Sequence, residues 1–465
     1  MIFGLAICVV LLFSAFKLRA HQSSESDEGV YLTTFKSVQN GFPIYQQTYL
    51  SQPPGFFVAI FPLYSMFGST LTAARLTIFF YSLIGLVALG WVGWELDSVV
   101  LSFIAVSVLY IIPIYTDQIL TFHADSLPST FSTLALASAL RFRNSVKWRW
   151  LVLSSIFVAI AILVKVDVTI LPSIFLVVVF TLVAKPQKVR NFVKSFALFS
   201  VAFFIVLLLF TLPFGINNIF TNVIELRFQA AAASTVDPSL FLHYLNQQPQ
   251  LIVLLIVAIG LSAIVVVKNK DKRFPFFIIF VWVASTFTIL VVYHPLLSHH
   301  LVLLAVPITL FFSFALFTVM NKLTTSKYVL IPIVLFTVVI LAGRLYYAVN
   351  QPEQILSETE IAAVNMVDKY TMQGDYIISD DGLVTGVSQR LTPPQLTDLS
   401  LVRIGSGNLT PTEFTHNLDT YKPKMIFAWT GKLITLHNFS QIMKQYHYNE
   451  IDRMDTYHHA YLLEP

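Results

Sequence analysis

Residues 195–214 read SFALFSVAFFIVLLLFTLPF, a run of twenty positions without a charged side chain. About 20 mostly apolar residues are needed for a helix to cross the hydrocarbon of a membrane. Backbone polar groups left unpaired in hydrocarbon are costly, and a helix pairs them within one segment. This run therefore predicts a membrane-spanning helix, and with it an integral membrane protein.

Ten further apolar runs lie on either side of the first: 1–16, 72–92, 98–116, 126–141, 150–165, 168–184, 250–267, 275–293, 301–320 and 328–346. Together they predict an all-α polytopic membrane protein with about 11 spanning helices. The run 1–16 has no basic residues ahead of it and no obvious small-residue cleavage site. We therefore expect a retained helix rather than a signal peptide.

The composition of the whole chain agrees with this class. Of its 465 residues, 56% are hydrophobic and 12% are charged, whereas about a quarter of an ordinary soluble protein is charged. So few charges cannot cover a water-exposed surface. The net charge is only +4 and its basic residues come in short clusters, which argues against nucleic acid as a partner. The single cysteine, Cys8, excludes an intrachain disulfide.

The placement of lysine and arginine predicts the orientation. Four loops, near 141–149, 185–194, 268–273 and 322–327, are basic and alternate with loops that are almost free of basic residues. Basic loops face the cytoplasm. The alternate loops, near 117–125, 215–249 and 294–300, and everything after 347 are therefore expected on the extracytoplasmic face of a plasma membrane.

The segment 53–68, PPGFFVAIFPLYSMFG, is apolar but short, and Pro62 interrupts it. We expect it to lie as an interfacial helix in the first outer loop rather than to span. If it did span, the loop 17–52 would move to the side opposite Asp125. The stretch from Gly29 to Val38 is a second candidate for an interfacial helix in this loop.

The tail differs from the rest of the chain in its mixture of polar and apolar residues. We expect 1–349 to form the membrane domain and 350–465 a small extracytoplasmic α/β domain. Ser357 and Glu360 have the spacing of a capping box at the start of a helix. Further signals predict strands at 375–379 and 424–429 and turns at 380–382 and 393–394.

The first outer loop holds the most informative pattern. Asp27 and Glu28 are adjacent acids just after the first apolar run, and on charge alone they are equally the solvated start of a loop. They are followed in order by Gly41, Pro43, Tyr45, Pro53-Pro54-Gly55, Phe67-Gly68 and Arg75. This order resembles the GT-C glycosyltransferases, membrane enzymes that use polyprenyl-phosphate sugars. The protein O-mannosyltransferase branch, with dolichyl-phosphate mannose as donor, and the lipid A aminoarabinose transferase branch are the most similar.

The resemblance implies a GT-C-like fold, a polyprenyl-phosphate sugar donor, and roles for several residues. Asp27 would be the general base, Glu28 its partner, and Asp125 a second acid on the outer face. Arg227, on an interfacial helix of the fourth outer loop, would contact the donor phosphate. Further donor or substrate contacts are implied for Lys165, Tyr45, His299 and His300.

Each of these positions also has a simpler explanation. Asp125 suits a helix N-cap, Arg227 suits a side chain that reaches toward lipid headgroups, and Lys165 has Asp167 close by as an ion-pair partner. Interfacial histidines are common, so His299 and His300 are weak signals alone. In the aminoarabinose branch a lysine at the position of Gln52 contacts the donor phosphate. In this sequence that contact is absent or is made by another residue.

The implied reaction is inverting transfer to an acceptor hydroxyl. It needs one base, because a phosphate leaves without the general acid that glycosidases require. The sequence requires no cofactor. It predicts no metal site, although it does not rule out a divalent metal ion. The expected acceptor is a lipid, a glycan or a protein. The alternative functions are a transporter or lipid flippase, and a sensor or scaffold that displays the C-terminal domain.

Overall fold

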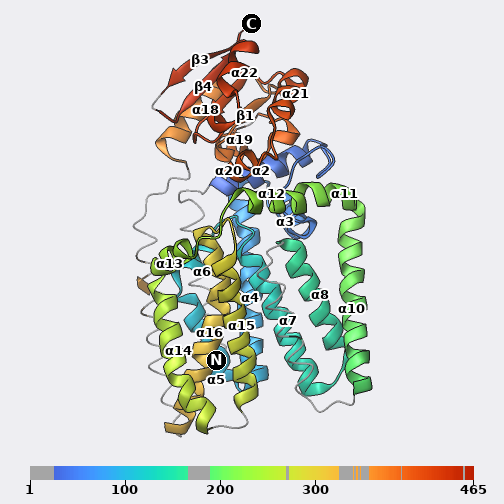
Figure 1. Cartoon of the computed structure of the whole chain (residues 1–465), viewed down its shortest axis with the longest axis vertical. Coiled ribbons are helices and arrows are strands. Elements are labelled where there is room, and N and C mark those ends of the chain that lie inside the picture. The colour runs from blue at the N-terminus through green and yellow to red at the C-terminus, as the bar shows by residue number, and fades with distance from the viewer. Residues whose placement is uncertain are drawn as a thin grey trace.

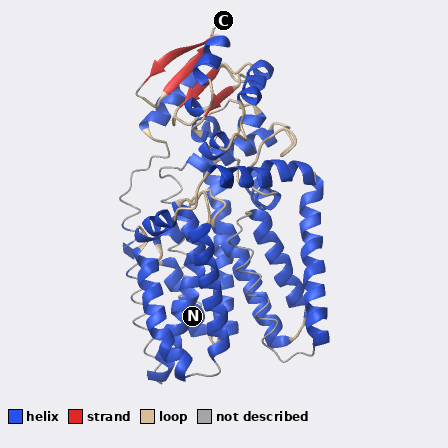
Figure 2. Cartoon of the chain, in the orientation of Figure 1, coloured by secondary structure: helices blue, strands red, loops and turns tan. Residues whose placement is uncertain are grey.

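The computed structural model describes residues 26–165, 189–268, 272–323 and 356–464, apart from 389, 454 and 455, together with five isolated positions between 178 and 346. Long helices form a bundle, and a smaller unit with a sheet lies at one end of it (Figure 1). Figure 2 shows the same division, with all strands in the smaller unit. The predicted spans 1–16, 168–184 and 328–346 lie outside the described ranges.

All eight predicted spans within the described ranges are helical. Seven of them correspond to α4 (Leu71–Leu96), α7 (Ser126–Ser145), α8 (Trp148–Val164), α10 (Val189–Thr211), α14 (Pro249–Lys268), α15 (Arg273–Val292) and α16 (Ala305–Leu323). By length and hydropathy, 4 described helices are able to cross a membrane, or up to 5 if the bent pair formed by α13 (Pro238–Asn246) and α14 counts as one. The chain is thus mostly helical and membrane-embedded, and the count of about 11 stays a prediction.

The eighth predicted span, 98–116, is not one helix. The structure divides it into α5 (Val99–Tyr110) and α6 (Pro113–Gln118), and Ile112 between them has an extended backbone. Pro113 has no N–H to donate and disfavours the helical conformation of the residue before it. The break brings the chain across the end of the bundle toward residues 119–125.

Short helices occupy the first and fourth outer loops, where we expected them. The first loop forms α2 (Ser26–Gln39) and α3 (Pro54–Met66). The fourth loop forms α11 (Ile216–Ile219), the π-helix η2 (Phe220–Glu225), α12 (Leu226–Ala233) and α13. In Figure 1, α2, α3 and α12 lie at the end of the bundle that faces the sheet-containing unit.

The C-terminal unit contains four strands in the order β1-β2-β4-β3. Strands β1 (Ile377–Ser379) and β2 (Met425–Ala428) are parallel, and β4 (His459–Leu463) is antiparallel to both β2 and β3 (Tyr448–Arg453). The structure confirms the two predicted strands and the capping box of α18 (Glu358–Tyr370), in which Ser357 and Glu360 bond reciprocally. The sequence reading missed β3 and β4.

Both faces of this sheet are covered, because side chains alternate along a strand. Ile378 and Ile426 belong to the cluster under α21 (Pro411–Tyr421) and α22 (Phe439–Gln445), whereas Ile377 and Phe427 pack toward α18. The main apolar cluster of the bundle includes none of these residues. The predicted domain boundary near 350 lies outside the described ranges and stays a prediction.

Candidate active site

Helix α2 is anchored to the bundle by a buried ion pair. The Arg75 guanidinium of α4 donates to both carboxylate oxygens of Glu28, from Nε at 2.9 Å and from Nη2 at 2.6 Å, and the Phe122 N–H donates to the same carboxylate at 2.6 Å. Burial alone would raise the pKa of Glu28, but the Arg75 hydrogen bonds and charge outweigh it and hold the pKa below its ordinary value. The ion pair therefore fixes α2 to the bundle at Glu28, the residue that follows Asp27.

The opposite side of α2 packs against α19 (Gly382–Val387) of the C-terminal unit. A Cβ atom added at Gly382 would lie 2.4 Å from the backbone nitrogen of Val30, so only glycine fits there. One turn further along α2, the Thr33 hydroxyl lies 2.8 Å from the Thr385 hydroxyl, and Lys36 donates to the Ser388 carbonyl. Helix α2 is therefore held from both sides.

A cavity of about 580 Å³ opens beside the first turn of α2. Most of the predicted site residues line it, although they come from five separate segments of the chain: Asp27, Asp125, Lys165, Arg227, His299 and His300. Tyr31, on the same wall, is buried, and its pKa is raised by burial and then by the charges of Asp27, Asp125 and Asp398, against the opposing effect of Arg227. The fold thus brings these charges around one hydroxyl group.

Asp125 lies in the cavity among one lysine and two histidines. Its carboxylate accepts a hydrogen bond from the Lys165 ammonium, and the Nε2 atoms of His299 and His300 lie 3.9 Å and 4.0 Å from it. Asp125 stands at the N-cap position of α7, but its side chain makes no capping hydrogen bond among the described residues. Burial would raise the pKa of Asp125, yet the charge of Lys165 outweighs it and holds the pKa far below its ordinary value. Asp167 lies outside the described residues.

The same group offers ligands for a metal ion, which the sequence reading did not predict. One ligand atom each from Asp125, His299 and His300 lies within 4.8 Å of the others. Two imidazoles and a carboxylate suit Zn²⁺ and similar ions. In this structure the carboxylate is also paired with Lys165, so a metal ion would share it or compete for it with that ammonium. The cluster is not evident in the sequence, because Asp125 and the two histidines come from distant segments of the chain.

Arg227 reaches the cavity from α12, which follows the π-helix η2. A π-helical turn is rare and often occurs at functional sites. The neighbouring Gln229 accepts a hydrogen bond from Asn408 of the C-terminal unit at 3.1 Å, so α12 is tied to both parts of the molecule. Arg227 is therefore placed in a cavity between them, whereas the simpler reading put it among lipid headgroups.

Two predicted site residues are not among the described residues that line the cavity. Glu28 faces Arg75 instead, as described above. Tyr45 has a left-handed backbone with φ of 63° and donates from its hydroxyl to the Gln52 carbonyl at 2.5 Å. Gln52 itself does line the cavity, and its amide donates to the Tyr31 hydroxyl at 2.9 Å. Glu28 and Tyr45 thus hold in place residues that line the cavity, namely Asp27 and Gln52.

The sequence reading missed one whole wall of the cavity. The C-terminal unit contributes Asp398 and Lys432 together with α20 (Leu401–Gly405) and its flanking serines. Lys432 follows β2, and ligands commonly bind beyond the carboxyl ends of parallel strands. That rule, applied to the two predicted strands, was the only signal in the sequence for this wall.

No model of a protein family matches the chain, and no curated protein matches it in sequence. Solved structures match it over its whole length. ArnT, the aminoarabinose transferase from Cupriavidus metallidurans, crystallised with undecaprenyl phosphate, is 14% identical at a TM-score of 0.68, covering 100% of this chain and 99% of that one.

A second match is AglB, the oligosaccharyltransferase of Archaeoglobus fulgidus, in complex with an inhibitory peptide and a dolichol-phosphate. It is 11% identical at a TM-score of 0.55 and covers 99% of this chain and 74% of that one. The chain therefore has the GT-C fold of these membrane glycosyltransferases, as its first outer loop predicted.

Proposed function

We propose that this protein is an inverting glycosyltransferase that moves a sugar from a polyprenyl-phosphate carrier to an acceptor hydroxyl. The observation that carries the proposal is that Asp27 and Arg227, 200 positions apart in the sequence, line one cavity. A carboxylate and a guanidinium in one cavity supply the two charges that this chemistry needs.

Asp27 acts as the general base. The acceptor oxygen attacks the anomeric carbon, its proton passes to the Asp27 carboxylate, and the bond from the anomeric carbon to the phosphate oxygen breaks. The bonding electrons leave with the polyprenyl phosphate. Glu28 is a positioning residue here, because its ion pair with Arg75 fixes the turn of α2 that carries Asp27.

Arg227 steadies the departing phosphate. A guanidinium donates two parallel hydrogen bonds to phosphate oxygens, and it is worth most where water is excluded. Lys165, His299 and His300 add donors on the floor of the cavity, where Asp125 holds Lys165 in place. A divalent metal ion, if bound by Asp125 and the histidines, would add charge at the same place.

The location of the cavity at one end of the bundle suits a lipid-linked donor, since the sugar can enter it while the prenyl chain stays in hydrocarbon. The ArnT and AglB structures hold undecaprenyl phosphate and a dolichol-phosphate. The finer topology belongs to the proposal: about 11 spans in a plasma membrane, with the cavity and the C-terminal unit on the extracytoplasmic face. A transporter would instead need ionisable residues midway along its spans.

The test is incubation of the purified full-length protein with a panel of labelled polyprenyl-phosphate sugars and mixed acceptors. We expect release or transfer of one sugar by the wild-type protein and loss of at least about 100-fold in Asp27→Asn. Arg227→Ala should lose a comparable factor, whereas Lys444→Ala, at an exposed position of α22, should not. Full activity in Asp27→Asn, in a protein that folds normally, would remove the proposed base.

A further inference from the structure

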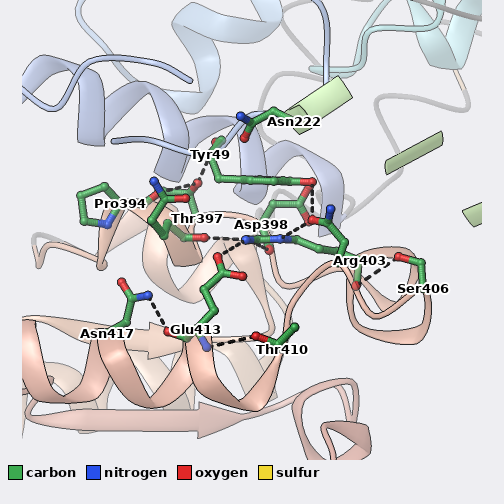
Figure 3. A network of polar contacts seen from close by, with 12 residues as sticks. Tyr49, Asn222, Pro394, Thr397, Asp398, Arg403, Ser406, Thr410, Glu413 and Asn417 are labelled. Atoms are coloured by element: carbon green, nitrogen blue, oxygen red, sulfur yellow. Dashed lines mark hydrogen bonds and ion pairs between the residues drawn. The ribbon is translucent and has the colours of Figure 1, made fainter. Parts of the chain in front are cut away.

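The wall that the C-terminal unit contributes to the cavity is rigidly built. The Arg403 guanidinium lies 3.6 Å from the centre of the Tyr49 ring of the first outer loop. It also donates to the Asp398 carbonyl at 2.9 Å and to the Glu413 carboxylate at 2.7 Å. Figure 3 shows this network, with Arg403 among Tyr49, Asp398 and Glu413. A buried guanidinium with this many partners fixes the loop that carries Asp398.

The same loop is bonded directly to the first outer loop. The Tyr49 N–H donates to the Pro394 carbonyl at 3.0 Å, and the Thr397 hydroxyl donates to the Tyr49 carbonyl at 3.0 Å (Figure 3). The Asp398 side chain is only 4% exposed and lines the cavity, with one carboxylate oxygen accepting from the Ser400 N–H at 2.9 Å. This carboxylate is thus held at a fixed place on the wall.

Hydrogen bonds also order the loop that carries Lys432. The Asp380 carboxylate, at the end of β1, accepts hydrogen bonds from the N–H groups of Trp429, Thr430 and Leu433 at 2.6, 2.9 and 2.8 Å. These bonds fold the segment after β2 into a tight loop, and its Lys432 side chain lines the cavity. The Lys432 ammonium lies 3.5 Å from the Asp380 carbonyl, so the carboxyl ends of the two parallel strands present a cation to the cavity that Asp398 also lines.

We propose that Asp398 and Lys432, with Ser400 and Ser406, form an acceptor subsite for a carbohydrate, so that the C-terminal unit selects the acceptor of the proposed transferase. The inference rests on the proposed function. The wall offers a carboxylate that accepts hydrogen bonds, an ammonium that donates them and two hydroxyls that do both. Sugar hydroxyls need that mixture, since each of them both donates and accepts.

Two other acceptor chemistries fit this wall less well. The charges of Asp398 and Lys432 cancel, so it has no excess of cations for an anionic headgroup. A peptide that binds by strand addition pairs with a sheet edge, but the edge strands β1 and β3 contribute none of the described lining residues. A carbohydrate is therefore the class that the wall favours.

A second cavity of about 420 Å³ lies on the other side of α20 and shares Leu401 and Gly405 with the first. Its lining includes the apolar residues Ile404, Leu409, Pro411 and Leu436, together with His437. Sugar rings present apolar faces to such surfaces. An acceptor of two or more sugar residues would extend from the subsite over α20 into this second cavity.

The experiment compares transfer with donor hydrolysis in the full-length protein, using the labelled donor that the wild type accepts. The acceptor probes are a panel of glycosides of one and two sugars, a set of hydroxyl-containing peptides, and water alone. We expect Asp398→Asn and Lys432→Met to raise the KM for the glycoside about 10-fold or more. The ratio of glycoside transfer to donor hydrolysis should fall in both variants, because the subsite contacts the glycoside and water needs no such contact.

Asp452→Asn on exposed β3 and Lys444→Met on α22 are the matched controls and should change neither reaction. The inference is overturned if both cavity variants keep the wild-type KM, or if peptides are used and glycosides are not. A one-sugar glycoside that binds as well as a two-sugar one overturns the extension over α20. If the wild type consumes no donor with any acceptor or with water, the proposed function fails, whereas wild-type transfer with unchanged variants overturns this inference alone.

Discussion

The backbones of Gly29 and Gly382 are in direct contact: a Cβ atom added at Gly29 would lie 2.1 Å from the carbonyl carbon of Gly382. Gly29 is two residues after Asp27 on α2, and Gly382 is the first residue of α19 in the C-terminal unit. The unit that lies outside the bundle is therefore seated directly against the helix that carries the proposed base. Four predictions follow from this contact and from the charges around it.

Gly382→Ala should push α19 away from α2, because the new methyl group meets backbone atoms that have no freedom to turn aside. We expect a loss of about 1–3 kcal/mol in the free energy of unfolding, and a fall in kcat as Asp27 moves. Gly260→Ala is the control, since nothing lies within 4 Å of its added Cβ. Unfolding in denaturant and transfer kinetics measure both effects; an unchanged kcat would show that the contact does not position α2.

Glu28→Gln should leave the Arg75 charge buried without its counter-ion. The expected loss of stability is about 3–5 kcal/mol, and Glu28→Gln combined with Arg75→Met should recover part of it. The folded-state pKa of Glu28 is lowered from its ordinary value of 4.5, so the pair stabilises above that pH and its contribution is lost as the pH falls below it. A double-mutant cycle by denaturant unfolding tests this, and additive losses would contradict a coupled pair.

Lys165→Met should both destabilise the protein and weaken donor use. It removes the ammonium that holds the Asp125 carboxylate charged, and it takes a cation from the phosphate side of the cavity. Adding Asp125→Asn should restore stability, since the buried charge is then gone, but it should not restore transfer. Thermal unfolding and donor KM separate the two effects, and wild-type transfer by the double variant would exclude Lys165 from donor binding.

Asp381, the N-cap residue of α19, should make stability depend on pH in the opposite sense to Glu28. Burial and then the charge of Glu360 raise the pKa of Asp381 from 3.8 to about 6. The folded state holds this proton more tightly than the unfolded state does, so stability falls as the pH rises from about 4 to about 6. Asp381→Asn keeps an oxygen to accept from the Leu383 N–H, which the aspartate does at 3.0 Å.

That variant should be more stable than wild type at pH 7, by at most about 3 kcal/mol, and equal to it near pH 4. Unfolding curves at both pH values check this. A wild-type protein whose stability rises steadily between pH 4 and pH 6, with the same slope in Asp381→Asn, would contradict the raised pKa.

Local patterns in the sequence determined the class of the protein and most of its helices. A run such as 195–214 needs no distant partner to be helical in a membrane, because a helix satisfies its own backbone. The capping box of Ser357 and Glu360 was equally readable, since both residues act within one turn. Pro113 interrupts a predicted span, because its missing N–H outweighs the apolar character of the run.

The site needed the tertiary structure. The sequence, through its resemblance to the GT-C enzymes, named Asp27, Asp125 and Arg227, but it could not tell that Glu28 pairs with Arg75 or that Lys165 pairs with Asp125. Its only indication of the wall that holds Asp398 and Lys432 was the pair of predicted strands, which did not identify either residue. Periodicity and hydropathy are properties of neighbours along the chain, whereas an ion pair or a cavity wall depends on which distant segments the fold packs together.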